Sequence, residues 1–311
     1  FLDTPPRKLH GSSARESGKN DLYDNIWFQR MTKTPYRKRT NSYSDKKMLE
    51  FDRDLTELGI RIKDANDRKV WSSCIDDSTL QTLYHFSNRG VVERYGGVVN
   101  AGKEAGIFHA ISPDKEELAV KIYRITSSDF KAMDDYLIGD PRFANIKRDK
   151  KSIVFAWTKK EFKNLTKATE VGVSVPKPIA SDKNVLIMEF IGVDGIAAQK
   201  VKDAERELNK TEVRTTFKEI VGFIRTLYRD AKLVHSDLSE YNILYFGGPV
   251  LIDMAQGVTL EHPRAEQFLQ RDVDNIVHFY SKLGLKCTSP EILKKVRGGQ
   301  THSDIRAVKC S

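Results

Sequence analysis

A change in residue pattern along the chain constrains its fold more than any other feature. Between residues 91 and 123, short runs rich in β-branched residues are separated by Gly-Gly at 96–97, by Gly102 and by Ser112-Pro113-Asp114. This spacing predicts a meander of antiparallel strands, because β-branched residues favour strands whereas glycine and proline interrupt them. Helical periodicity dominates the second half of the chain. The sequence therefore predicts an α+β protein with a β-rich first half and a helical second half.

The remaining elements are predicted from similar signals. Helices are expected at Met48–Arg61, Asp77–Gly90, 153–171, 211–231 and 263–283, and strands at Val185–Phe190, Ile243–Phe246 and Val250–Ile252. Gly247-Gly248-Pro249 separates the last two strands, which predicts a hairpin. Residues 126–150 are polar and aperiodic, so we expect an irregular insertion there, of a kind that is usually functional or mobile.

These elements predict one folded domain between two tails. Residues 1–46 are basic and carry little apolar periodicity, which is typical of a disordered segment. The folded domain is expected at 47–290, with a first lobe at about 47–190 and a second at about 191–290. Residues 291–311 are expected to form a C-terminal tail. The composition, with 39% hydrophobic and 31% charged residues, is that of a globular protein.

The positive charge of the chain is unevenly distributed. The formal net charge is +9, and residues 1–50 hold 11 Lys/Arg and 6 Asp/Glu, which gives this segment +5 (11 − 6). A solvated tail that aids solubility would explain this excess. A polyanionic partner such as RNA, attracted through its phosphates, would explain it equally well. Composition alone leaves both interpretations open.

Several classes of protein are disfavoured. The longest apolar stretch, Val185–Ile191, is interrupted by Glu189 and is far shorter than the roughly 20 residues of a membrane span. No secretory signal is expected from the first residues. Cys74, Cys287 and Cys310 are widely spaced, which argues against a disulfide framework or a zinc site. We therefore expect a cytoplasmic protein without a membrane partner.

The most specific motif runs from His235 to Asn242 and is followed, after the predicted hairpin, by Asp253. An Asp, an Asn five residues later and a second Asp at the end of a strand form the catalytic-loop pattern of kinases. Asp237 would accept the proton of an attacking hydroxyl, while Asn242 and Asp253 would give Mg²⁺ the oxygen ligands that it prefers. An ordinary polar loop before a hairpin is the alternative.

Lys121 lies in a predicted apolar strand, at the position of the lysine that contacts ATP phosphates in kinases. An isolated lysine in a strand is normally an edge residue, or one that extends its ammonium into solvent. The helix at 153–171 favours the first interpretation, because Glu161 lies in the middle of its apolar arc and needs a cation there. The opposite, polar face of that helix is predicted to carry Lys159, Lys160, Lys163, Lys167 and Glu170.

Two further segments match parts of a nucleotide site. The turn at Gly96–Gly106, which contains Lys103, precedes the lysine strand as a phosphate-covering turn should, although it lacks the G-x-G-x-x-G pattern. The strand at Val185–Phe190 would be the hinge of a kinase, where the carbonyl of Glu189 and the amide of Ile191 bind adenine. A plain hairpin turn and a simple core strand are the alternatives.

Several stretches together carry a family resemblance. They are Ile60–Asp64, Gly102–Ala105, Ala119–Arg124, Met133–Leu137, Phe155–Leu165, Met188–Gly192, His235–Asn242, Ile252–Gln256 and His262-Pro263. Over roughly residues 47–290 the sequence resembles the RIO kinases, specifically the archaeal form of the RIO-one subfamily. The resemblance implies a two-lobed, protein-kinase-like fold with an antiparallel N-lobe and a small helical C-lobe.

The resemblance also implies roles for individual residues. The nucleotide-binding residues would be Lys121, Glu161, Glu189, Ile191 and Lys103; the catalytic residues Asp237 and Asp253; and the metal ligands Asn242 and Asp253. The cofactors would be ATP and Mg²⁺, with Mn²⁺ as a second choice of metal. Asp253 would also accept a phosphoryl group during ATP hydrolysis. The implied cellular role is maturation of the small ribosomal subunit, with rRNA and protein as partners.

The sequence departs from ordinary protein kinases after Asp253. Met254-Ala255 replaces Phe-Gly, no Ala-Pro-Glu segment follows, and fewer than 60 residues remain, so a full activation segment is lacking. Protein phosphorylation and ATP turnover therefore both stay open as the main activity. A small-molecule phosphotransferase of the same fold and a non-catalytic, nucleotide-gated ribosome-binding scaffold are the alternative functions.

Overall fold

The computed structural model describes residues 65–126, 130–205 and 207–298. The predicted basic tail at 1–46 and the helix expected at Met48–Arg61 lie outside the described residues. Within them, no helix combines the length and the apolar character that a membrane crossing requires.

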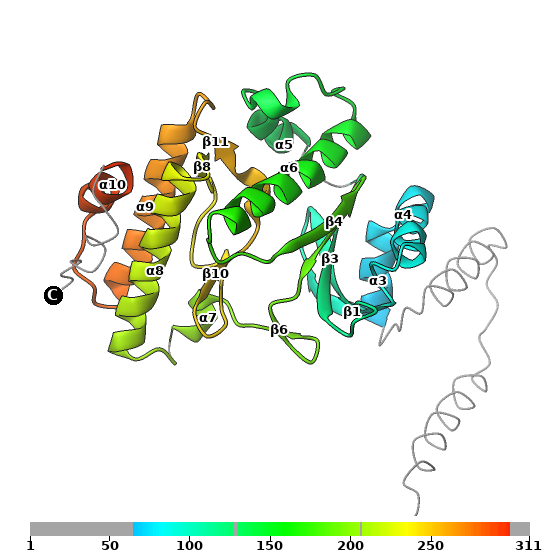
Figure 1. Cartoon of the computed structure of the whole chain (residues 1–311), viewed down its shortest axis with the longest axis horizontal. Coiled ribbons are helices and arrows are strands. Elements are labelled where there is room, and N and C mark those ends of the chain that lie inside the picture. Colours follow the sequence, from blue (N-terminus) through cyan, green and yellow to red (C-terminus); the bar gives the residue numbers. More distant parts are fainter. Residues whose placement is uncertain (1–64, 127–129, 206, 299–311) are drawn as a thin grey trace, which may run out of the picture. The chain divides into compact units, whose positions relative to one another are not determined.

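A five-stranded antiparallel sheet lies at the centre of the first lobe (Figure 1). Its strands, in spatial order, are β1 (Arg94–Ala101), β2 (Ala105–Ile111), β3 (Glu117–Tyr123), β5 (Val185–Glu189) and β4 (Pro178–Asp182). The predicted meander at 91–123 is confirmed as β1, β2 and β3, and the predicted strand at Val185–Phe190 is confirmed as β5. The first three strands pair in chain order because short turns join them.

One face of the sheet is covered by two helices. Phe108, Val120 and Ile187 pack with the helices α3 (Ala65–Cys74) and α4 (Asp77–Asn88) in one apolar cluster. Because side chains alternate along a strand, Lys121 points to the opposite face from Val120. In the ladder, Lys121 is paired with Ile107 on one side and Leu186 on the other. The register therefore places this lysine at the centre of the sheet, on the face away from α3 and α4.

Helix α6 (Lys150–Glu170) confirms the helix predicted at 153–171 and begins three residues earlier. Its N-terminus is capped by Asp149, whose carboxylate accepts a hydrogen bond from the amide of Ser152 at 3.0 Å. The helix contacts β4, on the sheet (Figure 1). It also contacts the 3-10 turn η2 (Met254–Gln256). Helix α6 therefore links the first lobe to the segment that follows Asp253.

One residue of this helix contradicts the sequence analysis. Lys160, expected on the polar face, is fully buried, and its ammonium donates a hydrogen bond to the carbonyl oxygen of Ala255 at 2.8 Å. Its side chain also lies against the rings of Tyr136 and Trp157. A second layer of structure covers this side of the helix, and helical periodicity within one segment does not reveal such a layer.

That layer comes from the predicted irregular insertion at 126–150. The prediction is wrong for part of it, because the segment contains the helix α5 (Phe130–Leu137) and the 3-10 turn η1 (Pro141–Phe143). Met133 and Leu137 of α5 are buried in a cluster with Trp157 of α6. The two turns of α5 are too short for a clear periodic signal, and tertiary burial stabilises them.

The second lobe is mainly helical. It contains β6 (Gly192–Val193), β7 (Ile196–Ala197), α7 (Val201–Ala204), α8 (Lys210–Arg229), β8 (Leu233–Val234), β9 (Ile243–Tyr245), β10 (Pro249–Leu251), β11 (Val258–Thr259), α9 (Ala265–Lys282) and α10 (Ser289–Arg297). The predicted helices at 211–231 and 263–283 are confirmed as α8 and α9. The predicted hairpin is confirmed as the antiparallel pair of β9 and β10.

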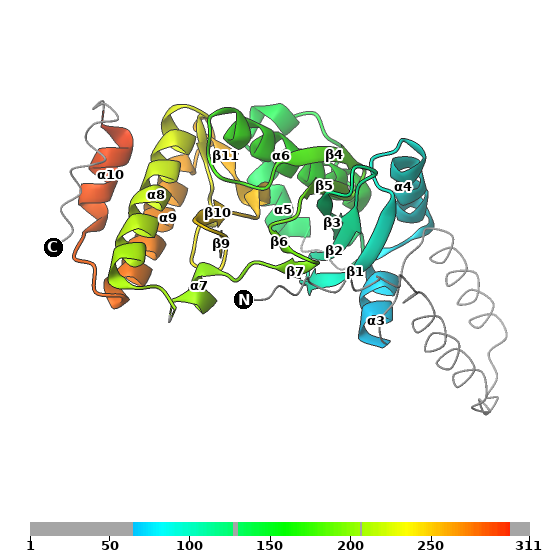
Figure 2. The same ribbon diagram turned by 60° about the horizontal axis from the view of Figure 1, so that its bottom comes forward.

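Helix α10 crosses the boundary that the sequence analysis placed at residue 290. It contacts both α8 and α9 (Figure 2), and Ile292, Leu293 and Val296 are buried in the main core. Thr288 and Glu291 form a capping box at its start. The structure thus extends the second lobe to residue 297, because a short amphipathic helix completes the core that α8 and α9 leave open.

We expect Ile292→Ala to lower the free energy of unfolding by about 2–5 kcal/mol, since it leaves a cavity beside α8 and α9. Chemical denaturation measures this change. Lys295→Ala, an exposed substitution one turn further along α10, is the control and should change the same quantity by less than about 0.5 kcal/mol. Equal stabilities of both variants would show that α10 is not part of the core.

The buried Lys160 should make the free energy of unfolding depend on pH. Burial, only partly opposed by Asp140, lowers the pKa of Lys160 to about 7 from its ordinary value of 10.5. Between these values the unfolded chain binds the proton that the folded chain has lost, so Lys160 makes the free energy of unfolding rise with pH. Lys160→Met removes this contribution. From pH 7 to pH 10 we expect denaturation curves to show the stability difference shifting in favour of the wild type.

Lys159→Met, which changes an exposed neighbour on the same helix, is the matched control and should show no such shift. A stability difference between wild type and Lys160→Met that stays constant over this pH range would contradict the prediction.

Candidate active site

Two carboxylates from separate parts of the chain meet at the ammonium of Lys121. Its ammonium lies 2.8 Å from Oε1 of Glu161 on α6 and 2.9 Å from Oδ1 of Asp253, which follows β10. The hydroxyl of Tyr123 donates to the other carboxylate oxygen of Glu161. The ion pair that we expected from the position of Glu161 in an apolar arc is therefore present, and Asp253 completes it from the second lobe.

In this cluster the ammonium of Lys121 and the two carboxylates each favour the charged form of the other. Burial disfavours the ammonium of Lys121, but the carboxylates of Asp253 and Glu161 outweigh this effect and raise the pKa of Lys121. Burial raises the pKa of Glu161, and Lys121 opposes that shift. Desolvation also acts against the charge of Asp253, yet the nearby Lys121 holds the pKa of this carboxyl below its ordinary range. Lys121 therefore stays protonated near neutral pH.

Asp253 differs from its partners in exposure. Its side chain keeps 46% of its surface accessible, whereas those of Lys121 and Glu161 keep 7% and 1%. Its backbone adopts the left-handed conformation, with φ of 62°, which residues other than glycine rarely adopt. Strained backbone of this kind is concentrated at functional sites. Asp253 is thus held as an accessible carboxylate beside a buried cation.

The catalytic-loop motif lies next to this cluster. The side-chain amide of Asn242 donates to the backbone carbonyl of Asp237 at 2.7 Å and to its carboxylate at 3.0 Å. The β9–β10 hairpin brings Asn242 opposite Ile252, whose amide donates to the Asn242 carbonyl at 3.0 Å. Burial, together with the negative charge of Asp253, raises the pKa of Asp237. The three polar residues predicted from the motif therefore share one region.

A buried carboxylate that the sequence analysis missed holds this loop. Asp272 of α9 accepts hydrogen bonds from the amide of Ser236 at 2.8 Å and from that of Leu238 at 2.9 Å, on either side of Asp237. Burial raises the pKa of Asp272 to about 7. Asp272 interrupts the apolar stripe of α9 four residues after Phe268, which is the same signal that identified Glu161.

His235 links the loop to the hairpin. Its Nε2 lies 3.0 Å from the carbonyl oxygen of Ile252, the residue before Asp253. Burial lowers the pKa of His235, so the ring is neutral near pH 7, and Nε2 carries the proton that the carbonyl accepts. The histidine of the predicted motif therefore acts structurally, by tying the start of the loop that carries Asp237 to Ile252, between the end of β10 and Asp253.

The other residues predicted to bind a nucleotide lie in the turn between β1 and β2 and at the end of β5. Lys103 lies exposed in the turn between β1 and β2, which is closed by a hydrogen bond from the amide of Gly102 to the carbonyl of Ala105 at 2.9 Å. Glu189 ends β5, and Ile191 lies two residues further on, before β6. The structure places these residues where a turn and a hinge are expected, and their contacts with a nucleotide stay a prediction.

The donors present fit a magnesium ion. Asp253 offers an accessible carboxylate, and Asn242, whose amide nitrogen is bonded to Asp237, keeps its side-chain oxygen as a further donor. Among the residues that the structure describes, no group of three or more His, Cys, Asp or Glu side chains could hold a metal alone. Magnesium commonly binds one or two protein carboxylates and completes its shell with water and phosphate oxygens.

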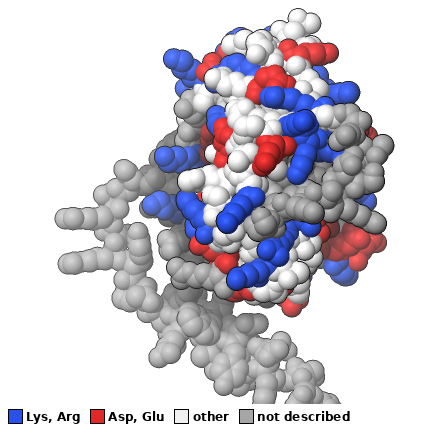
Figure 3. All heavy atoms as spheres, turned by 90° about the vertical axis from the view of Figure 1, so that its left-hand side faces the viewer, with Lys and Arg blue, Asp and Glu red and all other residues white. Residues whose placement is uncertain are grey.

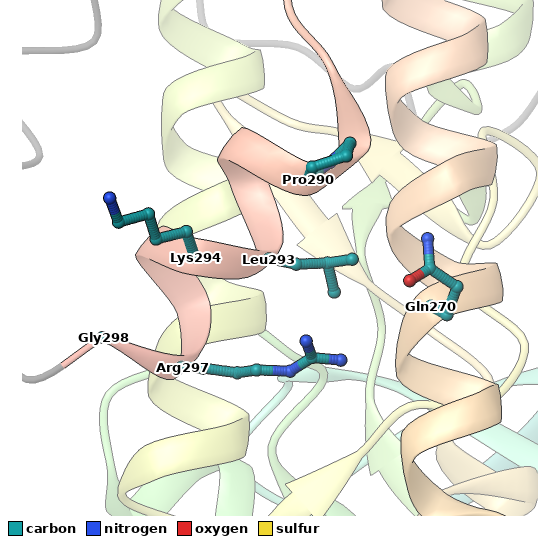
Figure 4. A pocket seen from close by; sticks show the side chains of 6 residues that line it. All are labelled: Gln270, Pro290, Leu293, Lys294, Arg297 and Gly298. Carbon is teal, nitrogen blue, oxygen red and sulfur yellow. The ribbon is translucent and has the colours of Figure 1, made fainter.

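A separate hollow lies in the second lobe. It has a volume of about 570 Å³ and is lined by Gln270, Pro290, Leu293, Lys294, Arg297 and Gly298. Leu293 and Arg297 of α10 point toward α9, and Lys294 points away (Figure 4). None of the predicted catalytic or metal-binding residues lines it.

On the face seen in Figure 3, basic and acidic side chains are interleaved rather than gathered into one patch of a single sign.

Comparisons with known proteins agree with this geometry. A family model described as the RIO domain matches residues 106–292. A RIO-type serine/threonine-protein kinase Rio1 from Haloferax volcanii is 44% identical over 253 residues, which cover 80% of this chain and 84% of the relative. The protein of the same name from Methanocaldococcus jannaschii is 38% identical over 82% of this chain and 87% of its own length.

A solved structure shares the fold. The Rio2 kinase from Chaetomium thermophilum, crystallised as an ADP/Mg²⁺-phosphoaspartate complex, superposes with a TM-score of 0.53 over 87% of this chain and 80% of its own, at 21% identity. This likeness confirms the predicted α+β, kinase-like architecture. The matched family model and the two archaeal relatives show that the chain belongs to the RIO family of serine/threonine-protein kinases.

Proposed function

We propose that this chain transfers the γ-phosphoryl group of Mg-ATP, to a serine or threonine of a protein, to water, or to both. The observation that carries the proposal is the bridge that Lys121 forms between Glu161 of the first lobe and Asp253 of the second. A fixed ammonium beside a metal-binding carboxylate is what phosphoryl transfer needs, because catalysis rests on positioning and on neutralising the phosphate charge.

The other residues take complementary roles. Lys121, held by Glu161, would contact the phosphates, while Asn242 and Asp253 would hold Mg²⁺ (or Mn²⁺), which neutralises charge on the phosphate oxygens when bound. Asp237 would accept the proton of the attacking hydroxyl or water, and its raised pKa favours this role because a base works best near the operating pH. The backbone of Glu189 and Ile191 would hold adenine, and Lys103 would lie over the phosphates.

Asp253 has a second proposed role, as a covalent phosphoryl acceptor. One of its carboxylate oxygens would attack the γ-phosphorus, the bond to the β,γ-bridging oxygen would break, and ADP would leave with that electron pair. Water would then attack the acyl phosphate and release inorganic phosphate, restoring the carboxylate. Support comes from the accessible side chain and from the phosphoaspartate named for the Rio2 kinase of Chaetomium thermophilum.

The cellular setting that we propose is maturation of the small ribosomal subunit in the cytoplasm, with rRNA and protein as partners. The family resemblance supports this setting, and the basic excess in residues 1–50 would suit an RNA-rich partner. This basic segment lies outside the described residues.

Radiolabelled ATP with Mg²⁺ tests the proposed chemistry. We expect Asp253→Asn to reduce turnover by at least about 10²-fold, because the variant loses a metal ligand and the proposed nucleophile. Asp230→Asn, an exposed substitution at the end of α8, is the control and should keep wild-type turnover.

The chemistry of the label separates the candidate functions. An acid-stable label on protein supports serine or threonine transfer, and a base-labile label that disappears in Asp253→Ala supports the aspartyl phosphate. Label found only on an added metabolite would indicate a small-molecule phosphotransferase instead. Bound nucleotide without any turnover in the wild type would indicate a scaffold and would contradict the proposal.

The raised pKa of Asp237 predicts a pH profile. A general base works only when ionised, so kcat/KM should rise with pH through a pKa above the ordinary carboxyl value of about 3.9. In Asp237→Asn we expect low activity without this acidic limb. Initial rates at fixed ionic strength measure the profile, and an unchanged limb in the variant would assign it to another group.

A further inference from the structure

The turn after Asp253 is held by side chains of α6. The amide nitrogen of Asn164 donates to the carbonyl oxygens of both Met254 and Gly257, each at 2.8 Å. The ammonium of Lys160 donates to the carbonyl oxygen between them, that of Ala255, at 2.8 Å. The short turn η2 that follows Asp253 is therefore fixed to a helix that is far away in the sequence.

Asn164 fits this position closely. Its side chain is fully buried. A Cβ atom added to Gly257 would lie only 2.9 Å from the amide nitrogen of Asn164, so this side chain would have to move, and a tight 3.1 Å from the carbonyl oxygen of Met254. Space therefore favours glycine at 257, whereas the backbone does not demand it, because any residue can adopt its φ of −54°.

Arg142 of the insertion sets the orientation of this amide. Its Nη1 donates to Oδ1 of Asn164 at 2.8 Å, which leaves the Asn164 amide nitrogen directed at the two carbonyls. Arg142 is itself fixed by the buried Asp140, through contacts of 2.9 Å from Nε and 2.7 Å from Nη2 to the two carboxylate oxygens. The paired geometry and the burial make this a strong interaction.

Asp253 depends on this arrangement because of its backbone. It adopts a left-handed conformation that is costly for a residue with a side chain, and the peptide groups that follow it must be held for that conformation to persist. Glu161, which fixes Lys121, precedes Asn164 by three residues on the same helix. One face of α6 therefore positions both the phosphate-binding ammonium and the backbone of the metal-binding carboxylate.

We propose that Asn164 is a positioning residue for Asp253, and that Arg142 keeps Asn164 in its working orientation. Neither side chain touches the reacting groups. The insertion at 126–150 thereby contributes to the metal site through Arg142 and Asn164, without a direct contact. This inference rests on the proposed function, which makes Asp253 a metal ligand.

The test uses the full chain with Asn164→Ala and, as matched control, Thr158→Val. Thr158 is also a buried polar residue of α6, but its hydroxyl bonds within the helix, to the carbonyl of Val154 at 3.0 Å. The first measurement is hydrogen–deuterium exchange of the amides of residues 254–257 in metal-free protein. We expect faster exchange in Asn164→Ala and wild-type exchange in Thr158→Val.

The second measurement is metal binding. With ADP present, the affinity for Mn²⁺ followed by electron paramagnetic resonance should fall about 10- to 100-fold in Asn164→Ala, the loss typical when a metal ligand loses its support. Binding of ADP without metal should stay at the wild-type level. Arg142→Gln should change exchange and Mn²⁺ affinity in the same direction and by less, and it decides the question if Asn164→Ala fails to fold.

The outcomes separate this inference from the proposed function. A wild type that turns over Mg-ATP and needs Asp253, combined with unchanged exchange and Mn²⁺ affinity in Asn164→Ala and Arg142→Gln, would overturn the inference alone. Equal effects in Thr158→Val would also overturn it, because they would reduce it to general stability of α6. A wild type without metal-dependent nucleotide binding or turnover would overturn both.

Discussion

The contact of Lys121 with two carboxylates is the interaction on which the rest of the structure depends. A buried ammonium is costly unless opposite charges and hydrogen bonds compensate for it, and Lys121 finds both in Glu161 and Asp253. Its two partners come from a helix packed on the sheet and from the end of a hairpin in the other lobe. Lys121 thus ties the two lobes together, beside the hydrogen bonds from α6 to the turn after Asp253.

Further polar side chains are buried around the contact of Lys121 with its two carboxylates. Asp272 holds the amides around Asp237, His235 holds the carbonyl before Asp253, and Asn164 holds the carbonyls after it. Each of these groups satisfies backbone atoms that irregular segments would otherwise leave unpaired. Buried polar networks are favourable only when their members are satisfied, so loss of one member should disturb its neighbours. The active region is therefore a continuous hydrogen-bonded unit.

Much of this could be predicted from the sequence, because some signals are local. Runs of β-branched residues and the spacing of glycines predicted the meander whose third strand carries Lys121, and Glu161 was identified by its place in an apolar arc. The same reasoning, applied to α9, would have identified Asp272. The burial of Lys160 and the helix α5 could not be predicted this way, because each is stabilised by the other segment. The contact of Asn164 with the turn at Met254 likewise joins positions 90 residues apart.

The pairing of Lys121 with Asp253 also has a consequence for the order in which ligands enter. Without nucleotide, the carboxylate already has an internal counter-ion at 2.9 Å, so a free divalent cation would have to separate this pair and leave the ammonium uncompensated on one side. In the proposed function a nucleotide would change this balance, since its phosphates would give the ammonium a new anionic partner and release the carboxylate. If Lys121 and Asp253 have the roles proposed above, a metal that arrives with a phosphate chain would therefore be favoured over a metal that arrives alone.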